Sequence, residues 1–82
     1  MPIHIVIANL PPGVTVEGVK TRFGERGLYG AITLLRDGNP GKVTAIFEVE
    51  NMDRIVADQI AYRIDGMFFR GRRLQSYVPL FL

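Results

Sequence analysis

The sequence holds 82 residues, carries a formal net charge of +2 and contains no cysteine. A chain of this length forms one domain that buries about 60% of its unfolded surface, which leaves little room for a large internal active-site cavity. The lack of cysteine excludes a disulfide framework, a thiolate metal site and a cysteine nucleophile. Because no tract has the biased composition of a disordered segment, we expect a compact soluble domain.

The first part of the chain predicts a strand followed by a helix. Residues 3–8 place a large aliphatic side chain at every second position, which is the period of a strand with one face against a core. Turn-forming residues follow at 9–13, and Thr15 is placed to cap a helix. The apolar stripe of that helix recurs at helical spacing: Val16, Val19 and Phe23.

The middle of the chain predicts a hairpin. Two β-like runs, residues 30–36 and 42–50, flank the sequence Asp-Gly-Asn-Pro-Gly at 37–41. Such a concentration of turn formers makes the two runs antiparallel neighbours.

A second helix and a last strand complete the order. Asn51 or Asp53 can cap the helix, and the Asp-Gly pair at 65–66 ends it. Its predicted buried stripe is Val56, Ala57, Ile60, Ala61 and Ile64. A short ribbon at 67–69 and a strand at 72–78 follow. The core aromatics are expected to be Phe23, Phe47 and one of Phe68 and Phe69, with Tyr62 partly buried.

The order βαββαβ predicts an α+β, ferredoxin-like sandwich: a four-stranded antiparallel sheet with two helices on one face, because each crossover is right-handed. Residues 5–10 and 42–49 form the central strands. Alternation places one set of side chains on the open face: His4, Val6, Ala8, Lys42, Thr44, Ile46, Glu48, Arg73, Gln75 and Tyr77. We expect this face to carry the function.

Four segments carry motifs of a known family. Ile-Val-Ile-Ala-Asn-Leu at 5–10 looks like its six-residue motif, and Lys-Val-Thr-Ala-Ile-Phe-Glu-Val at 42–49 looks like its eight-residue motif. The Asp-Gly pair at 65–66 and Gly-Arg-Arg-Leu at 71–74 match its usual helix end and last-strand start. On these motifs the chain resembles the RNA recognition motif (RRM) family over residues 1–78, followed by an apolar tail at 79–82. The resemblance implies single-stranded RNA as the ligand.

The open face departs from the family pattern. The positions that carry stacking aromatics in most RNA-binding members are Val6, Thr44 and Ile46 in this sequence. Base stacking contributes about 1–3 kcal/mol per base, so we expect weak or non-standard RNA binding by the sheet.

The predicted RNA contacts therefore move to the last strand and the loops. They act through phosphate attraction and hydrogen bonding rather than stacking. The main contacts are Lys42, Arg73, Gln75 and Tyr77, with assistance from Asn9, Thr44 and Arg36, while Val6, Ile46 and His4 complete the face.

A protein-interaction module is the alternative. An exposed apolar patch of Val6 and Ile46 invites a protein partner, a second copy of the chain or a lid. The tail at 79–82 is the candidate lid, and the helices offer a further surface for a partner.

Catalysis, a cofactor and a metal are not expected. The sequence has one histidine and one serine and no carboxylate pair placed in a predicted pocket. No apolar run approaches the roughly 18 residues of a membrane helix, and residues 1–4 lack the basic region of a secretion signal. We expect a non-enzymatic protein located in the cytoplasm.

Overall fold

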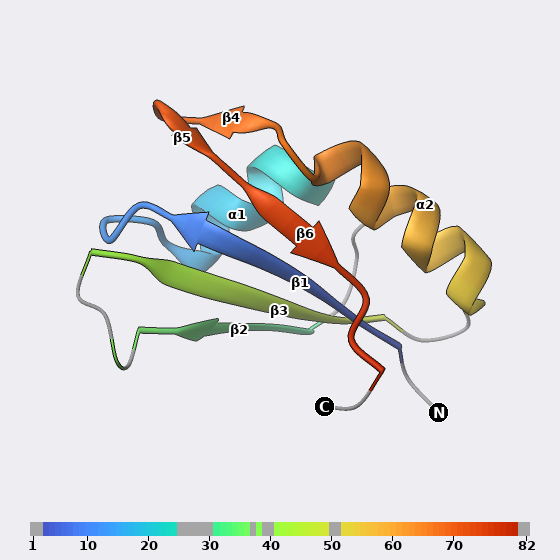
Figure 1. The fold of residues 1–82 in the computed structure, drawn as a ribbon. Helices are drawn as coiled ribbons and strands as arrows, with labels where there is room; N and C mark the ends of the chain where they lie inside the picture. The colour runs from blue at the N-terminus through green and yellow to red at the C-terminus, as the bar shows by residue number, and fades with distance from the viewer. Residues whose placement is uncertain (1–2, 25–30, 37, 39–40, 50–51, 81–82) are drawn as a thin grey trace.

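A computed structural model describes residues 3–24, 31–36, 38, 41–49 and 52–80 of the chain. Figure 1 shows the elements in chain order: β1 (Ile3–Leu10), α1 (Val16–Gly24), β2 (Ala31–Leu35), β3 (Val43–Val49), α2 (Arg54–Ile64), β4 (Phe68–Phe69), β5 (Arg72–Arg73) and β6 (Gln75–Tyr77). The predicted order is confirmed. The predicted last strand is divided at Leu74, so that β5 pairs with β4 and β6 joins the main sheet.

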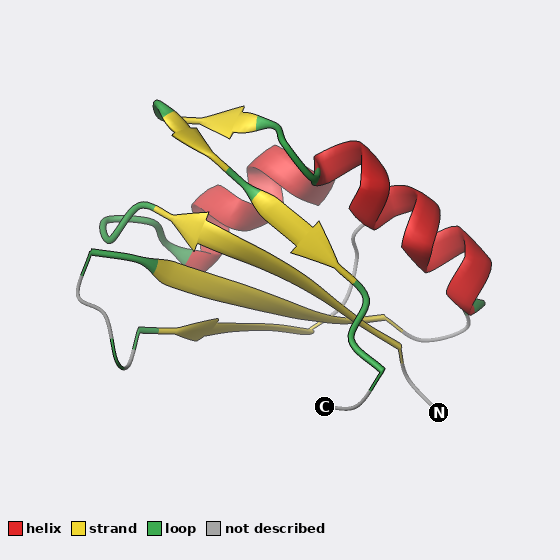
Figure 2. Cartoon of the chain, in the orientation of Figure 1, coloured by secondary structure: helices red, strands yellow, loops and turns green. Residues whose placement is uncertain are grey.

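The main sheet is antiparallel and has the strand order β2-β3-β1-β6. The two segments predicted to be central, β1 and β3, are therefore central. Figure 2 shows both helices on the same side of this sheet, as the right-handed crossovers predict. The α+β, ferredoxin-like architecture is confirmed, and it leaves the other side of the sheet without a covering helix.

The core lies between the sheet and the helices. The side chains predicted to point inward from β1 and β3 are all buried: Ile5, Ile7, Val43, Ala45, Phe47 and Val49. Phe23 of α1 meets Phe47 edge-on with ring centroids 6.5 Å apart, and it stacks on Phe69 at 6.1 Å. Phe69 is 7% exposed and Phe68 is 68% exposed, so the expectation of one buried residue in this pair is confirmed.

Both helices begin at the predicted kind of cap. The Thr15 hydroxyl accepts a hydrogen bond of 3.0 Å from the Gly18 N–H, and the Asp53 carboxylate accepts one of 3.0 Å from the Val56 N–H. Each cap satisfies an N–H group that the first turn leaves unpaired. Asp53 is thus the cap of α2, and the other candidate, Asn51, lies outside the described residues.

The predicted apolar stripes of the helices were too wide. Val16 and Val56 are 37% and 42% exposed, because they lie at the borders of stripes whose centres face the sheet. The expectation that Tyr62 is partly buried was wrong. Tyr62 is 83% exposed, since it projects from the side of α2 opposite the buried residues Ala61 and Ile64.

Candidate nucleic-acid interface

Four outward-facing residues form one row across the open face of the sheet. Ile46 of β3 lies opposite Thr33 of β2 on one side and opposite Val6 of β1 on the other, and Val6 in turn lies opposite Tyr77 of β6. The predicted neighbours Val6 and Ile46 are therefore in register. Tyr77 is 53% exposed and ends the row with an aromatic ring.

Val6 contributes little surface to this row. Its side chain is 4% exposed, although it is not part of the core cluster between the sheet and the helices. A valine on a central strand is short, and the longer side chains of Ile46 and Tyr77 lie on either side of it. The prediction that Val6 is exposed was wrong, so a ligand on this face meets Tyr77 and the half-buried Ile46 first.

The rows on either side differ in charge. On one side, His4 lies opposite Glu48, and both are half-buried. On the other side, Gln75 lies opposite Ala8 and is exposed, and the half-buried Thr44 lies nearby on β3. The face therefore carries a carboxylate toward the start of β1 and neutral polar groups toward its end.

The end of the sheet beyond those neutral groups carries two basic residues, Lys42 and Arg73, and is called the basic end below. The Arg72 guanidinium donates a hydrogen bond to the Gly41 carbonyl, which ties β5 to the residues that precede β3. Figure 1 shows the end of β1, the start of β3 and the β4–β5 hairpin at the same end of the sheet. Lys42 and Arg73 are both exposed there. Within the described ranges the single ion pair joins Arg54 to Asp58, so neither cation has a carboxylate partner among those residues.

Two of the predicted assisting residues have structural partners. The Arg36 guanidinium donates to the carbonyls of Pro12 at 2.7 Å and Val14 at 2.6 Å, and so fixes the loop between β1 and α1. The Asn9 amide donates to the Arg73 carbonyl at 2.9 Å. Sequence reasoning missed these roles because the partners lie 22 to 64 residues away.

Asn9 also has a φ of 71°, a left-handed conformation that asparagine tolerates better than most residues. It lies where the pairing of β1 with β3 shifts register, between Ile7 and Leu10. The conformation and the hydrogen bond together fix the end of β1 beside β5.

The tail leaves the sheet toward α2. The Arg54 guanidinium donates to the Val78 carbonyl at 3.0 Å and to the Pro79 carbonyl at 3.5 Å. Leu80 is 79% exposed and so does not pack over Ile46 as a lid would. The remaining residues of the predicted lid, 81 and 82, lie outside the described residues.

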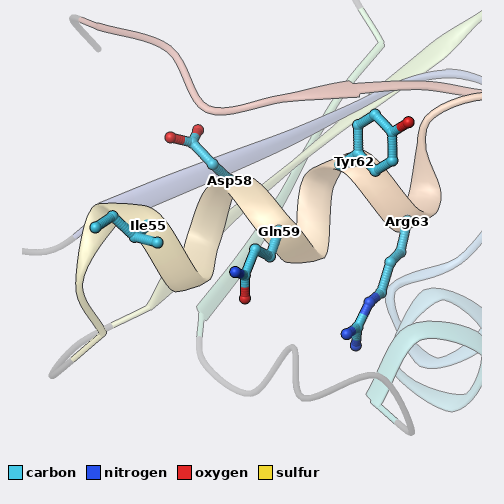
Figure 3. Close-up of a pocket in the computed structure, with 5 residues that line it drawn as sticks. All are labelled: Ile55, Asp58, Gln59, Tyr62 and Arg63. Atoms are coloured by element: carbon cyan, nitrogen blue, oxygen red, sulfur yellow. The ribbon is translucent and has the colours of Figure 1, made fainter.

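A second surface lies on the outer side of α2. Five side chains of this helix line a shallow groove of about 460 Å³: Ile55, Asp58, Gln59, Tyr62 and Arg63. Figure 3 shows them along the length of the helix, at the spacing i, i+3, i+4, i+7 and i+8 that is typical of one helix face. Ile55 is 71% exposed, and Tyr62 is more exposed still. Sequence reasoning named the helices as a possible surface but not these residues. The signal that it overlooked is that Ile55 and Tyr62 lie seven residues apart, on one helix face and outside the predicted buried stripe.

The described residues hold no group of three or more histidine, aspartate or glutamate side chains that could bind a metal ion. Of the two helices described, neither is long and apolar enough to span a membrane.

Comparisons with known proteins define the fold. No family model matches the sequence, and no curated protein matches it. Among solved structures, the chain is similar to the third RRM of Pes4, with a TM-score of 0.76, 22% identity, and coverage of 93% of this chain and 89% of that one. It is similar to a chain of the Snu17p–Pml1p intermediate of RES complex assembly, with a TM-score of 0.75, 26% identity, and coverage of 98% and 68%.

A third similar structure is SR1-RRM1 of Plasmodium falciparum in complex with ACAUCA RNA, with a TM-score of 0.61, 27% identity, and coverage of 96% of this chain and 85% of that one. The domain therefore has the fold of an RNA recognition motif, and the resemblance predicted from the sequence is confirmed at this level.

Proposed function

We propose that the domain binds single-stranded RNA along β6 and the basic end of the sheet, through Tyr77, Gln75, Lys42 and Arg73. The observation that carries this proposal is the hydrogen bond from Arg72 to Gly41, because it ties β5, which leads into the strand that bears Tyr77, to the residue before Lys42. The RNA-bound SR1-RRM1 supports the choice of ligand, since it shares this fold and 27% sequence identity.

Each proposed contact has a distinct chemical role. Lys42 and Arg73 attract phosphates, which position the strand without reading its sequence. The half-exposed Tyr77 ring stacks on one base, and Gln75 offers an amide donor and acceptor to a base edge. With one ring in place of a broad aromatic platform, the affinity is modest and depends strongly on salt.

The test uses the two tyrosines that the structure describes, which lie on different surfaces of the domain. Tyr77→Ala removes the ring on the open face, and Tyr62→Ala removes an equally large ring from the outer side of α2. In fluorescence anisotropy titrations with a short single-stranded RNA library at low salt, Tyr77→Ala weakens binding about 5- to 150-fold. Tyr62→Ala leaves it unchanged. Equal effects of the two substitutions, or no binding by the parent chain, would contradict the proposal.

A protein partner on α2 is the second candidate function. It is supported by the exposed Ile55 and Tyr62 and by the two-protein assembly to which the Snu17p–Pml1p neighbour belongs. The same variants separate the candidates, because Tyr62→Ala then weakens association with the partner and Tyr77→Ala does not. The reverse pattern, measured in a pull-down, would exclude α2 as the docking face.

A further inference from the structure

The β4–β5 hairpin buries one phenylalanine and exposes its neighbour. Phe69 is 7% exposed and stacks on Phe23, whereas Phe68 is 68% exposed. Successive residues of a strand point to opposite faces, so β4 uses one face for the core and presents the other to solvent. The core cluster of buried residues accordingly includes Phe69 but not Phe68. The Phe68 ring is therefore accessible to a ligand on the outer face of the hairpin.

The outer face of the hairpin continues the row of proposed RNA contacts. Arg73, Gln75 and Tyr77 are exposed and the residues that separate them are buried, so the alternation is not interrupted where β5 passes into β6. Figure 1 shows β5 and β6 as one continuous run of chain from the hairpin to the edge of the sheet. Phe68 lies directly opposite Arg73 in the β4–β5 pair, and residues opposite each other point to the same face. One exposed row thus extends from Tyr77 to Phe68.

Hydrogen bonds fix the hairpin relative to the sheet. The Gly66 N–H donates to the Leu74 carbonyl at 2.8 Å, and the Leu74 N–H donates to the Met67 carbonyl at 2.7 Å. The hydrogen bond from Asn9 to the Arg73 carbonyl joins the same ribbon to the end of β1. The aromatic rings at the two ends of the row are therefore mounted on one rigid support, which lowers the entropy cost of binding a ligand across both.

The charge around Phe68 favours a polyanion as the ligand. Residues 66–80 include Arg70, Arg72 and Arg73 and no aspartate or glutamate. A segment of one charge repels a second copy of itself and attracts phosphates. An exposed ring among cations is also the combination that binds single-stranded nucleic acid, because bases stack on the ring while phosphates meet the positive charge.

We propose that Phe68 is a second base-stacking ring, so that one RNA strand runs from Tyr77 past Gln75 and Arg73 onto the β4–β5 hairpin. This inference rests on the proposed RNA binding and extends it beyond the sheet. Along the strand, Arg73 lies about 13 Å from Tyr77, and β4 lies about 5 Å to the side. Successive nucleotides of a stacked strand are about 3.4 Å apart, so a dinucleotide reaches only one ring. The site therefore takes a strand of several nucleotides, with one base on each ring and phosphates near Arg73.

Substitutions at position 68 separate a stacking ring from a general apolar contact. Phe68→Tyr keeps the ring, and Phe68→Leu keeps an apolar side chain without a ring. In anisotropy titrations at low salt with single-stranded RNA of about eight nucleotides, Phe68→Leu weakens binding about 5- to 150-fold. Phe68→Tyr binds like the parent chain. Because the side chain is exposed, both variants keep the melting temperature of the parent.

A tryptophan reporter tests the contact directly, since the chain contains no tryptophan. Phe68→Trp places an indole on the hairpin, and Ile55→Trp places one on the outer side of α2, where the native side chain is 71% exposed. Stacking on a base quenches indole fluorescence. Saturating RNA is therefore expected to quench the emission of Phe68→Trp and to leave that of Ile55→Trp unchanged.

The outcomes distinguish this inference from the proposed function. If Tyr77→Ala weakens RNA binding while Phe68→Leu does not, the second ring is overturned and RNA binding by the sheet stands. Equal quenching of the two tryptophan reporters would likewise overturn the second ring. A parent chain that binds no RNA would overturn both proposals. If Phe68→Leu weakens capture of a protein partner but not of RNA, the hairpin is a protein-docking surface instead.

Discussion

The two faces of β1 and β3 contain similar residue types but differ in environment, since one packs in the core and the other lies toward solvent. Toward the helices, Ile5, Ile7 and Phe47 are fully buried and fill the core. Toward solvent, the same strands carry Thr44 and Ile46, which are half-buried and have no helix above them. Alternation along two strands therefore separates the residues that determine the fold from those that are available to a ligand.

This separation explains why the fold is retained without an aromatic platform. Each strand residue belongs to one face, so a ring can be replaced on the open face without disturbing the packing beneath. The replacement lowers the affinity that base stacking can contribute, because a half-buried isoleucine has no ring to stack on a base. Matched substitutions on the two faces can test this division.

The largest expected effect is on the inward face. Ile7 and Ile46 are the same residue type on neighbouring central strands, but they point to opposite sides. Ile7→Ala removes a fully buried side chain and lowers the free energy of unfolding by about 2–5 kcal/mol. Ile46→Ala, from a half-buried position, lowers it by less than half as much. Urea denaturation followed by circular dichroism measures both, and equal losses would contradict the division.

The next effect is a gain of RNA affinity on the outward face. Ile46→Tyr places a ring in the row that already ends at Tyr77, and one added stacking contact strengthens RNA binding about 5- to 150-fold. Ile46→Leu is the control, because it keeps an aliphatic side chain of the same size. Anisotropy titrations with the same RNA measure both variants. An affinity that the tyrosine leaves unchanged would mean that bases do not reach the centre of the face.

How much the sequence could predict also follows from the two faces. Inward residues repeat with a regular period, and the hairpin, caps and helix stop each depend on a few neighbouring residues, so the order of elements and most of the core were predictable. The burial of Val6 on the open face was not predictable, because it depends on the longer side chains of Ile46 and Tyr77, which come from neighbouring strands. The prediction of wide buried stripes on the helices was wrong for a related reason. Helical spacing shows which residues share a face, but it does not show how far the sheet extends beneath that face.

The sequence predicted which side chains belong to the candidate site, but it did not predict their hydrogen-bond partners within the chain. Arg36 was predicted to assist RNA binding, yet its guanidinium donates to two carbonyls of the first loop. Arg72 and Gly41, which join the basic end together, are 31 residues apart. Such hydrogen bonds depend on tertiary placement, and no local pattern in the sequence indicates them.

The smallest expected effect distinguishes the basic end of the sheet from the helix side. The chain has two lysines, Lys42 beside the start of β3 and Lys20 on α1, and both are exposed. A lysine that contacts one phosphate of a single strand contributes about 0.7 to the slope of log affinity against log salt concentration. Lys42→Ala lowers the slope by that amount, whereas Lys20→Ala leaves it unchanged. Titrations at four salt concentrations measure the slope, and equal slopes for the two variants would place the phosphates away from the basic end.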